Sequence, residues 1–310
     1  MASILQFPYL KALRPHQWTK NLIVFAALLF SFQLTPTAIL GSVLAFVLFC
    51  CVSSSFYLIN DIVDVEADRQ HPVKCKRPIA SGQVSIPVAT GMAIVLLGGA
   101  LIIGWLQNPM LGAVLLAYAL LQVAYNVRLK RTVLLDVIAI ATGFVLRASA
   151  GGAATGITLS SWFLLCTAML SLFLGVEKRK AELQAFQLRG GKGRAVLYRY
   201  SMALLGRMEN TVISGTVLTY ALWSSGPNVG GASTPWMLLT LPLVIYGVFR
   251  YQFLSDPEEV ERRSKNRAEG AQTERPEDIL LHDFPILATV VSWILMTFGI
   301  LWLKSRGVIA

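Results

Sequence analysis

The chain has 310 residues, of which 55% are hydrophobic and only 14% are charged, and its formal net charge is +10 at pH 7. Its mean hydropathy is +0.60. Soluble domains hold about 25% charged residues, so this composition excludes an ordinary soluble enzyme and predicts an all-α membrane protein. We expect a single integral-membrane domain over 1–310, and no nucleic-acid partner.

Membrane-spanning helices are predicted by runs of about 20 mainly apolar residues. In chain order, nine such runs lie near 22–36, 38–59, 87–106, 110–127, 133–150, 160–177, 208–225, 236–254 and 284–303. Pro or Gly separates most of them, as expected for turns between helices. We therefore predict a bundle of about nine transmembrane helices.

The charged residues are confined to alternate connections. Lys and Arg number four in 60–86, eight in 177–207 and six in 250–283, whereas the connections near 35–37, 107–109, 151–159 and 226–235 have no charged residue. Basic residues mark the cytoplasmic side of a membrane protein. We therefore expect a multi-pass protein of the cell (plasma) membrane with a cytoplasmic N-terminus, cytoplasmic loops 60–86, 177–207 and 251–283, and an active site on that side.

Acidic residues also gather on this side, although they contribute little to topology. If the second span continues past residue 60, a turn of about 100° per residue places five polar side chains on one face and directs Glu66 elsewhere. These five are Tyr57, Asn60, Asp61, Asp64 and Asp68. Carboxylates at such spacings repel one another unless a cation lies among them.

Short oxygen-bearing side chains are ligands that suit Mg²⁺, which keeps positions open for substrate phosphates. We therefore predict a Mg²⁺–diphosphate site at the membrane surface. Its predicted metal ligands are Asn60, Asp61, Asp64 and Asp68, and the three aspartates are also the predicted catalytic residues. The alternative interpretation is a solvated acidic helix end that interacts with neighbouring bases.

The same stretch resembles a known family. "NDIVDVEAD", 60–68, has the form N-D-x-x-D-x-x-x-D and is similar to the signature of the UbiA-type intramembrane prenyltransferases. The resemblance covers nearly the whole chain. It is most specific to the decaprenyl-phosphate phosphoribosyltransferase branch in "RPHQWTKN" (14–21), "NDIVDVEADRQHPVKCKRPIASG" (60–82), "LLDVIAIATGFVLRASAGG" (134–152), "SSWFLLCTAMLSLFLGVEKRKAEL" (160–183) and "RPEDILLHDFP" (275–285).

One stretch departs from the wider family. Members that transfer a prenyl group to an aromatic ring typically have a second Asp-rich motif after the sixth span, where this chain reads "GVEKRKAEL" (175–183) without an Asp. This counts against an aromatic prenyltransferase, which is the nearest alternative. Extra cations fit a donor and an acceptor that bring additional phosphates. The candidate substrate-binding residues are Lys20, Tyr57, Lys74, Arg77, Lys130 and Lys178; each basic residue among them could instead serve topology alone.

Arg147 lies inside a predicted span. A charge there costs at least ~2.5 kcal/mol unless it is paired or faces a cavity. Two interpretations stay open. The side chain either extends outward past Gly151 or faces a polar cavity and binds a phosphate, which the resemblance favours. Asp136, three turns earlier, is either its partner or a packing residue.

The resemblance implies Mg²⁺-dependent transfer of a 5-phosphoribosyl group from phosphoribosyl diphosphate (PRPP) to a decaprenyl-type polyprenyl phosphate, with release of diphosphate. PRPP, the lipid and the membrane are thus the expected partners, and a homo-oligomer such as a trimer is compatible with the family. Segment 251–283 mixes both charges and is either a cap over the site or a solvated loop. A transporter is disfavoured because hydropathy shows no inverted repeat.

Overall fold

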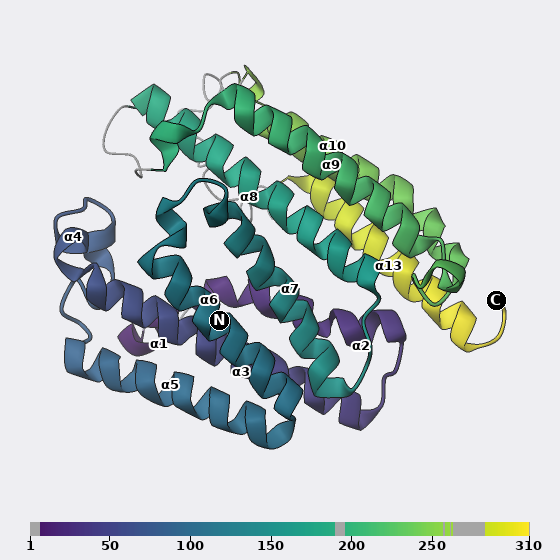
Figure 1. Cartoon of the computed structure of the whole chain (residues 1–310), viewed down its shortest axis with the longest axis horizontal. Helices are drawn as coiled ribbons and strands as arrows, with labels where there is room; N and C mark the ends of the chain where they lie inside the picture. The colour runs from purple at the N-terminus through teal and green to yellow at the C-terminus, as the bar shows by residue number, and fades with distance from the viewer. Residues whose placement is uncertain (1–6, 190–195, 257, 261, 263–282, 310) are drawn as a thin grey trace. The chain divides into compact units, whose positions relative to one another are not determined.

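The structure is a computed structural model that describes residues 7–189, 196–256, 258–260, 262 and 283–309. These residues form helices joined by turns, and no strand occurs among them (Figure 1). The predicted all-α fold is confirmed. Of segment 251–283, for which we expected a cap or a solvated loop, residues 257, 261 and 263–282 lie outside the described residues.

The helices follow one another in an order close to that predicted. The first part of the chain forms α1 (Pro8–Ala12), the 3₁₀ segment η2 (Pro15–Phe25), α2 (Ala26–Ser31), α3 (Pro36–Val63), α4 (Val65–Arg69), η3 (Lys74–Lys76), α5 (Ile86–Gln107) and α6 (Pro109–Val127). The second part forms η4 (Leu129–Arg131), α7 (Leu135–Thr155), α8 (Ser161–Arg189), η5 (Leu197–Arg199), α9 (Met202–Ser224), η6 (Pro227–Val229), η7 (Pro235–Thr240), α10 (Leu241–Ser255) and α13 (Phe284–Ser305).

Seven helical stretches among the described residues are long and apolar enough to cross a membrane. They are Pro36–Val63, Ile86–Gln107, Pro109–Val127, Leu135–Thr155, Ser161–Gln187, Pro235–Ser255 and Phe284–Ser305. This makes the chain a multi-pass membrane protein, but the predicted count of nine spans is not confirmed. The run near 22–36 folds largely as 3₁₀ helix and a short α-helix. The run near 208–225 is α9, which is long enough but carries Arg207 and Glu209 in its first turns.

The chain divides into two compact units, which are described separately. Unit 1 comprises 1–29, 33–127 and 146–158, and unit 2 comprises 30–32, 128–145 and 159–310. In unit 1, α3 packs on α5 and on η2, and α5 packs on α6. A buried cluster that includes Phe49, Leu115 and Tyr118 fills the space between α3 and α6.

One close approach inside unit 1 depends on a glycine. A Cβ atom at Gly151, on α7, would lie 1.9 Å from the backbone carbonyl oxygen of Val24. Real Cβ atoms do not come this near to a backbone atom, so only glycine lets α7 and η2 pack at this separation. The contact holds η2 against the last part of α7 within unit 1, which also carries the acidic motif.

Unit 2 is built mainly from α8, α9, α10 and α13. Helix α8 packs along α9, and α10 packs on α13. An aromatic cluster fills one part of its core, where the Phe30 and Trp223 rings meet edge to face at 4.8 Å between centroids. Many large apolar side chains of the two units are exposed, among them Ile94 and Leu106 on α5 and Leu295 on α13.

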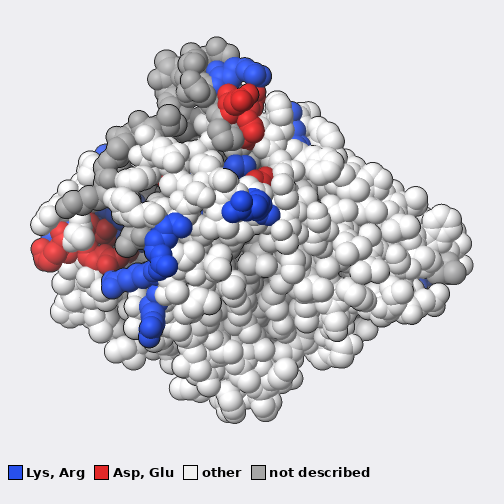
Figure 2. Space-filling model, turned by 45° about the horizontal axis from the view of Figure 1, so that its top comes forward, with Lys and Arg blue, Asp and Glu red and all other residues white. Residues whose placement is uncertain are grey.

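Exposed apolar surface of this extent suits contact with lipid rather than water. Most of the face seen in Figure 2 bears neither basic nor acidic side chains.

Candidate functional site

The end of α3 carries the acidic motif. α3 stops at Val63, and Asp64 (φ −91°, ψ 6°) separates it from α4. Helical hydrogen bonding nevertheless continues across the break, because the Asp64 amide donates to Asn60 O at 2.9 Å and the Asp68 amide donates to Asp64 O at 2.8 Å. The predicted continuation of the helix past residue 60 therefore holds approximately.

The acids of this motif do not share one environment. Asp61 and Asp68 are buried, with 3% and 2% of their surface exposed. Asp64 and Glu66 are exposed, and Asn60 is half-buried. A buried carboxylate must be paired or hydrogen-bonded, so Asp61 and Asp68 require cationic partners within the protein.

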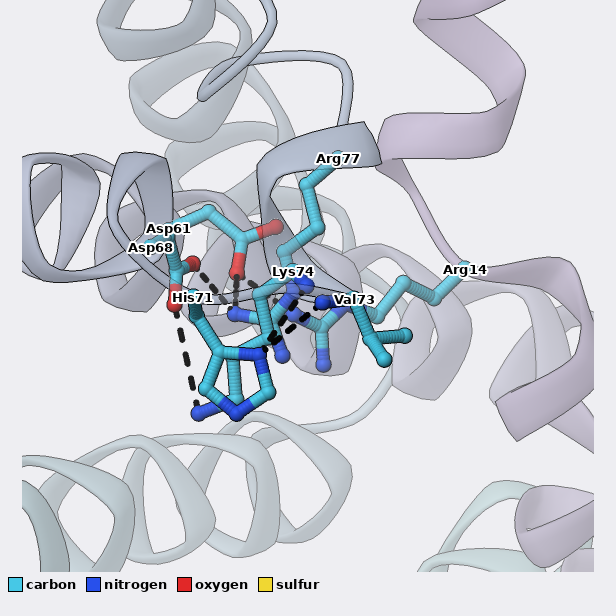
Figure 3. A network of polar contacts seen from close by, with 7 residues as sticks. All are labelled: Arg14, Asp61, Asp68, His71, Val73, Lys74 and Arg77. Atoms are coloured by element: carbon cyan, nitrogen blue, oxygen red, sulfur yellow. Dashed lines mark hydrogen bonds and ion pairs between the residues drawn. The ribbon is translucent and has the colours of Figure 1, made fainter.

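The loop after α4 supplies two of those partners, Lys74 and Arg77. Its far end is anchored by Ile79 and Val84, which are buried in an apolar cluster with Val65 of α4. The near end is shaped by His71, whose Nδ1 accepts hydrogen bonds from the backbone N–H groups of residues 73 and 74 at 3.2 and 3.3 Å (Figure 3). Lys74 and Arg77 are therefore presented to the acidic helix by a folded loop.

The resulting network joins three cations to two carboxylates (Figure 3). Arg77 Nη1 donates to Asp68 Oδ2 at 2.5 Å and to Asp61 Oδ1 at 3.0 Å. Arg14 Nη2 donates to the same Asp61 oxygen at 2.5 Å, and Lys74 Nζ lies 3.9 Å from Asp68 Oδ1. Both carboxylates are thus neutralised, and one positive charge remains in excess.

Sequence reasoning did not select Arg14. The residue reaches the network from the turn between α1 and η2, where the Ser54 hydroxyl of α3 donates to Leu13 O at 2.9 Å and Trp18 Nε1 donates to Ser54 Oγ at 3.0 Å. The guanidinium also lies over the ring of Tyr57, 5.0 Å from its centroid. The sequence feature that could have indicated Arg14 is its place in the chain, because it is the first residue of the stretch 14–21 that carries part of the family resemblance.

Asn60 and Asp64 are the members of the motif with unengaged side chains. Neither makes a side-chain hydrogen bond or ion pair with a described residue, and among those residues no group of three or more His, Cys, Asp or Glu side chains is arranged to hold a metal. Two oxygen donors one helical turn apart fit Mg²⁺, which needs few protein ligands and takes the rest from water and phosphate. Metal ligation by Asp61 and Asp68 stays a prediction.

The remaining predicted substrate-binding residues lie on several helices of both units. In unit 1, the ring of Tyr57, on α3, lies under the Arg14 guanidinium, as described above. Lys20, on η2, donates to Gln17 Oε1 at 2.6 Å. Of the remaining predicted cations, Lys130 lies on η4 and Lys178 on α8, and both belong to unit 2. Their roles in substrate binding stay predictions.

Arg147 is buried inside unit 1, with 7% of its surface exposed. Its Nε donates to Asn21 Oδ1 and its Nη2 to the Tyr118 hydroxyl, both at 2.7 Å. The interpretation in which it extends outward past Gly151 is therefore wrong. Asp136 belongs to unit 2, where it pairs with Arg179 of α8. Phosphate binding by Arg147 stays a prediction.

The basic stretch of α8 is largely occupied within unit 2. Arg179 Nε lies 2.8 Å from Asp136 Oδ2, and Arg179 also pairs with Glu182. Lys180 Nζ donates to Glu209 at 2.8 Å and lies 3.6 Å from Glu177. Two of the three consecutive bases, Arg179 and Lys180, are thus engaged by carboxylates of their own unit.

Comparison with known proteins agrees with the fold and the motif. Residues 21–269 match the UbiA prenyltransferase family. The decaprenyl-phosphate phosphoribosyltransferase of Mycolicibacterium smegmatis is 36% identical over 298 residues, covering 92% of this chain and 89% of the relative. The protein of the same name from Corynebacterium glutamicum is 38% identical over 250 residues, covering 78% and 75%.

Among solved structures, a UbiA homolog from Archaeoglobus fulgidus bound to DMAPP and Mg²⁺ has a TM-score of 0.64 at 21% identity, covering 94% of this chain and 98% of that one. A likeness at this identity shows the fold alone. Taken with the sequence match, it confirms the resemblance predicted from the sequence: the chain belongs to the UbiA prenyltransferase family.

Proposed function

We propose that this protein transfers a 5-phosphoribosyl group from PRPP to a decaprenyl-type polyprenyl phosphate. The products are diphosphate and polyprenylphosphoryl-5-phosphoribose. Relatives named decaprenyl-phosphate phosphoribosyltransferase, similar over most of the chain, support this choice within the family.

The observation that carries the proposal is the composition of the network at the end of α3. Three cations meet two buried carboxylates, while Asn60 and Asp64 keep their oxygen atoms available to a metal. Such a site offers both a divalent cation and basic side chains to one substrate. It suits a small donor that carries a diphosphate and a further phosphate better than a prenyl diphosphate, whose only charged group is the diphosphate.

In this reaction the bond between ribose C1 and the diphosphate oxygen breaks, and a bond forms between C1 and an oxygen of the lipid phosphate. C1 becomes oxocarbenium-like, and attack from the opposite face inverts its configuration. The lipid phosphate is already ionised at neutral pH, so no side chain is needed as a general base. Catalysis by this chain is then positioning and electrostatic stabilisation.

The protein groups divide the task. Asn60 and Asp64 are the residues that would hold Mg²⁺, with Asp61 and Asp68 as candidate additional ligands. When bound, the metal supplies positive charge to the departing diphosphate. Lys74 and Arg77, which lie in the loop after α4, bind phosphate oxygens of the donor. Asp61 and Asp68 hold these cations in place through the contacts shown in Figure 3.

The membrane setting follows from the acceptor. Its isoprenoid tail lies along the exposed apolar helix surfaces, and its phosphate lies at the cytoplasmic surface of the plasma membrane. The soluble donor enters from the cytoplasm, where the predicted loops 60–86, 177–207 and 251–283 lie. In this arrangement Lys20, Lys130, Arg147 and Lys178 are further candidates for phosphate contacts.

The test uses purified full-length protein in two parallel assays. The first supplies labelled PRPP, Mg²⁺ and polyprenyl phosphate, and the second supplies labelled 4-hydroxybenzoate, Mg²⁺ and a polyprenyl diphosphate. We expect lipid-extractable label in the first assay. Label in the second assay alone would overturn the proposal in favour of an aromatic prenyltransferase.

Asp64→Ala tests the metal site in the first assay. Since Asp64 is exposed and its side chain makes no hydrogen bond or ion pair with a described residue, the variant should fold normally and lose turnover by at least ~10²-fold. Glu66→Ala is the matched control, because Glu66 is also an exposed acid of this motif and, among the described residues, pairs with exposed Arg69. Full activity of Asp64→Ala would remove Asp64 from the site.

A further inference from the structure

Arg14 and Arg77 are held on a single oxygen atom. Arg14 Nη2 and Arg77 Nη1 both donate to Asp61 Oδ1. Two guanidinium groups this close repel each other, and the buried Asp61 carboxylate offsets that repulsion. The arrangement resembles what a multiply charged anion needs from its site, because two positive groups stand side by side before the anion arrives.

The backbone of Arg14 is a second observation. The residue has φ 55° and ψ 60°, in the left-handed region that non-glycine residues rarely adopt. It also precedes Pro15, and a residue before proline ordinarily takes an extended conformation. Strained residues of this kind persist where the surrounding structure fixes them, and they cluster at ligand-binding sites. Here the strain directs the Arg14 side chain toward Asp61 and Tyr57.

The hydrogen-bonding capacity of both groups is only partly used. A guanidinium has five N–H donors in a planar fork. Arg14 contacts Asp61 through Nη2 alone, and Arg77 contacts both carboxylates through Nη1 alone. Their side chains remain 23% and 28% exposed. A purely structural Arg–carboxylate pair is frequently bidentate, whereas these contacts leave the rest of each fork open to a ligand.

We propose that Arg14 and Arg77 form a two-guanidinium clamp for the phosphate oxygens of a substrate, and that Asp61 is the positioning residue of the clamp. The inference deepens the proposed function and rests on it for the identity of the substrate. The ligand chemistry is a phosphate or diphosphate group. It is supplied either by the soluble donor or by the lipid acceptor, and the experiment distinguishes the two.

The primary experiment compares Arg14→Gln with Lys11→Gln in full-length protein. Lys11 is an exposed residue of α1, so its replacement removes the same charge from the same segment without touching the network. For Arg14→Gln we expect a KM for PRPP, or for the lipid phosphate, raised roughly 10- to 100-fold. The substrate whose KM rises identifies the phosphate that the clamp holds. Lys11→Gln should leave both KM values within about twofold.

A binding measurement separates the clamp from catalysis. Inorganic diphosphate is titrated into the same proteins by calorimetry, in the absence of divalent metal. The wild type and Lys11→Gln should bind it, and Arg14→Gln should bind it at least roughly tenfold more weakly. If the wild type transfers no phosphoribosyl group but this difference in diphosphate affinity is found, the clamp stands and the proposed function fails.

Two further variants address folding and the role of Asp61. Arg14→Lys keeps a charge for Asp61 but lacks the planar fork, so a folded Arg14→Lys protein with weakened diphosphate binding supports the clamp even if Arg14→Gln does not fold. Asp61→Asn should raise the same KM as Arg14→Gln, because it removes the negative charge that holds the two guanidinium groups side by side. Unchanged KM values and unchanged diphosphate affinity in folded Arg14→Gln or Arg14→Lys would overturn the proposal.

Discussion

Replacing Tyr200 by Phe removes the hydroxyl group that hydrogen-bonds to the Asp136–Arg179 ion pair, the most deeply buried ion pair in the described part of unit 2. The Tyr200 hydroxyl donates to Asp136 Oδ1 at 2.8 Å and accepts a hydrogen bond from the Leu134 amide at 2.8 Å. Asp136 is fully buried and also pairs with Arg179 of α8. The hydroxyl therefore joins the end of η5 to the start of α7, and Asp136 in turn joins α7 to Arg179 of α8.

The magnitude follows from the two bonds lost. A hydrogen bond to a charged group contributes about 1.5–3 kcal/mol, and a buried amide without a partner costs about 1–3 kcal/mol. The neighbouring atoms relax in part, so we expect Tyr200→Phe to lower the free energy of unfolding by about 3 kcal/mol at pH 8. For a chain of this size that corresponds to a melting temperature lower by roughly 5 °C.

The effect should depend on pH. Burial, together with the hydrogen bond to Asp136, raises the pKa of Tyr200 from 10.0 to about 12. Below pH 10 the hydroxyl is neutral in both the folded and the unfolded chain, so its stabilisation is fully present. As the pH rises from 10 towards 12 the unfolded chain ionises first, and about 2–3 kcal/mol of that stabilisation is lost. Phe at this position cannot ionise.

The assay is thermal unfolding of the detergent-solubilised protein at pH 8, 10 and 11. The gap between wild type and Tyr200→Phe should be largest at pH 8 and should narrow at pH 11. Tyr198→Phe is the matched control, because Tyr198 is 64% exposed and its loss should change the melting temperature little at any of these pH values. A gap that is absent at pH 8, or that stays constant up to pH 11, would refute this account of the ion pair.

Two further predictions concern unit 1. Gly151→Ala should lower the free energy of unfolding by about 3 kcal/mol or more, because the new Cβ atom would lie 1.9 Å from the Val24 carbonyl oxygen. Gly98→Ala is the control: no atom lies within 4 Å of the place its Cβ atom would take, so this substitution should be neutral or stabilising in the same thermal assay. Equal effects of the two substitutions would contradict the close packing of α7 on η2. Tyr118→Phe removes the hydrogen bond from Arg147 Nη2 to the Tyr118 hydroxyl and should cost about 1.5–3 kcal/mol, because one partner of that bond is charged. An unchanged melting temperature would show that this bond does not hold Arg147.

The positions of the long helices could be predicted from the sequence because hydropathy and proline placement both act locally. The predicted span 38–59 lies within α3, which begins at Pro36, and the predicted span 110–127 corresponds to α6, which begins at Pro109. Proline is well suited to the first turn of a helix, where its missing N–H is not needed. These boundaries depend on the segment itself and on nothing distant in the chain.

Other features depend on distant partners and could not be predicted this way. Hydropathy does not distinguish a 3₁₀ helix from an α-helix, so the run near 22–36 was expected to span the membrane. In α9, Glu209 is buried because Lys180 of α8 and Gln252 of α10 both donate to it. The helix therefore keeps a charge in a packed position, which lowers its hydropathy below that of a typical span.

The acidic site shows the same distinction. The helical period placed Asp61, Asp64 and Asp68 on one continuous helix and gave them equal standing as metal ligands. In the structure Asp61 lies at the end of α3, Asp64 lies between α3 and α4, and Asp68 lies on α4. In the structure, Asp61 is paired with an arginine 47 residues earlier and another 16 residues later. A helical projection contains no information on either partner, so it cannot separate an engaged carboxylate from an available one.

That separation changes what the motif can do. An Asp-rich motif without cations of its own would gather several negative charges and favour more than one metal ion. Here the two buried aspartates are neutralised by Arg14, Lys74 and Arg77, whose side chains remain partly exposed, while Asp64 lies exposed beside them. The network can then offer a metal ligand through Asp64 and donors for phosphate oxygens through Arg14 and Arg77, which come from other segments of the chain.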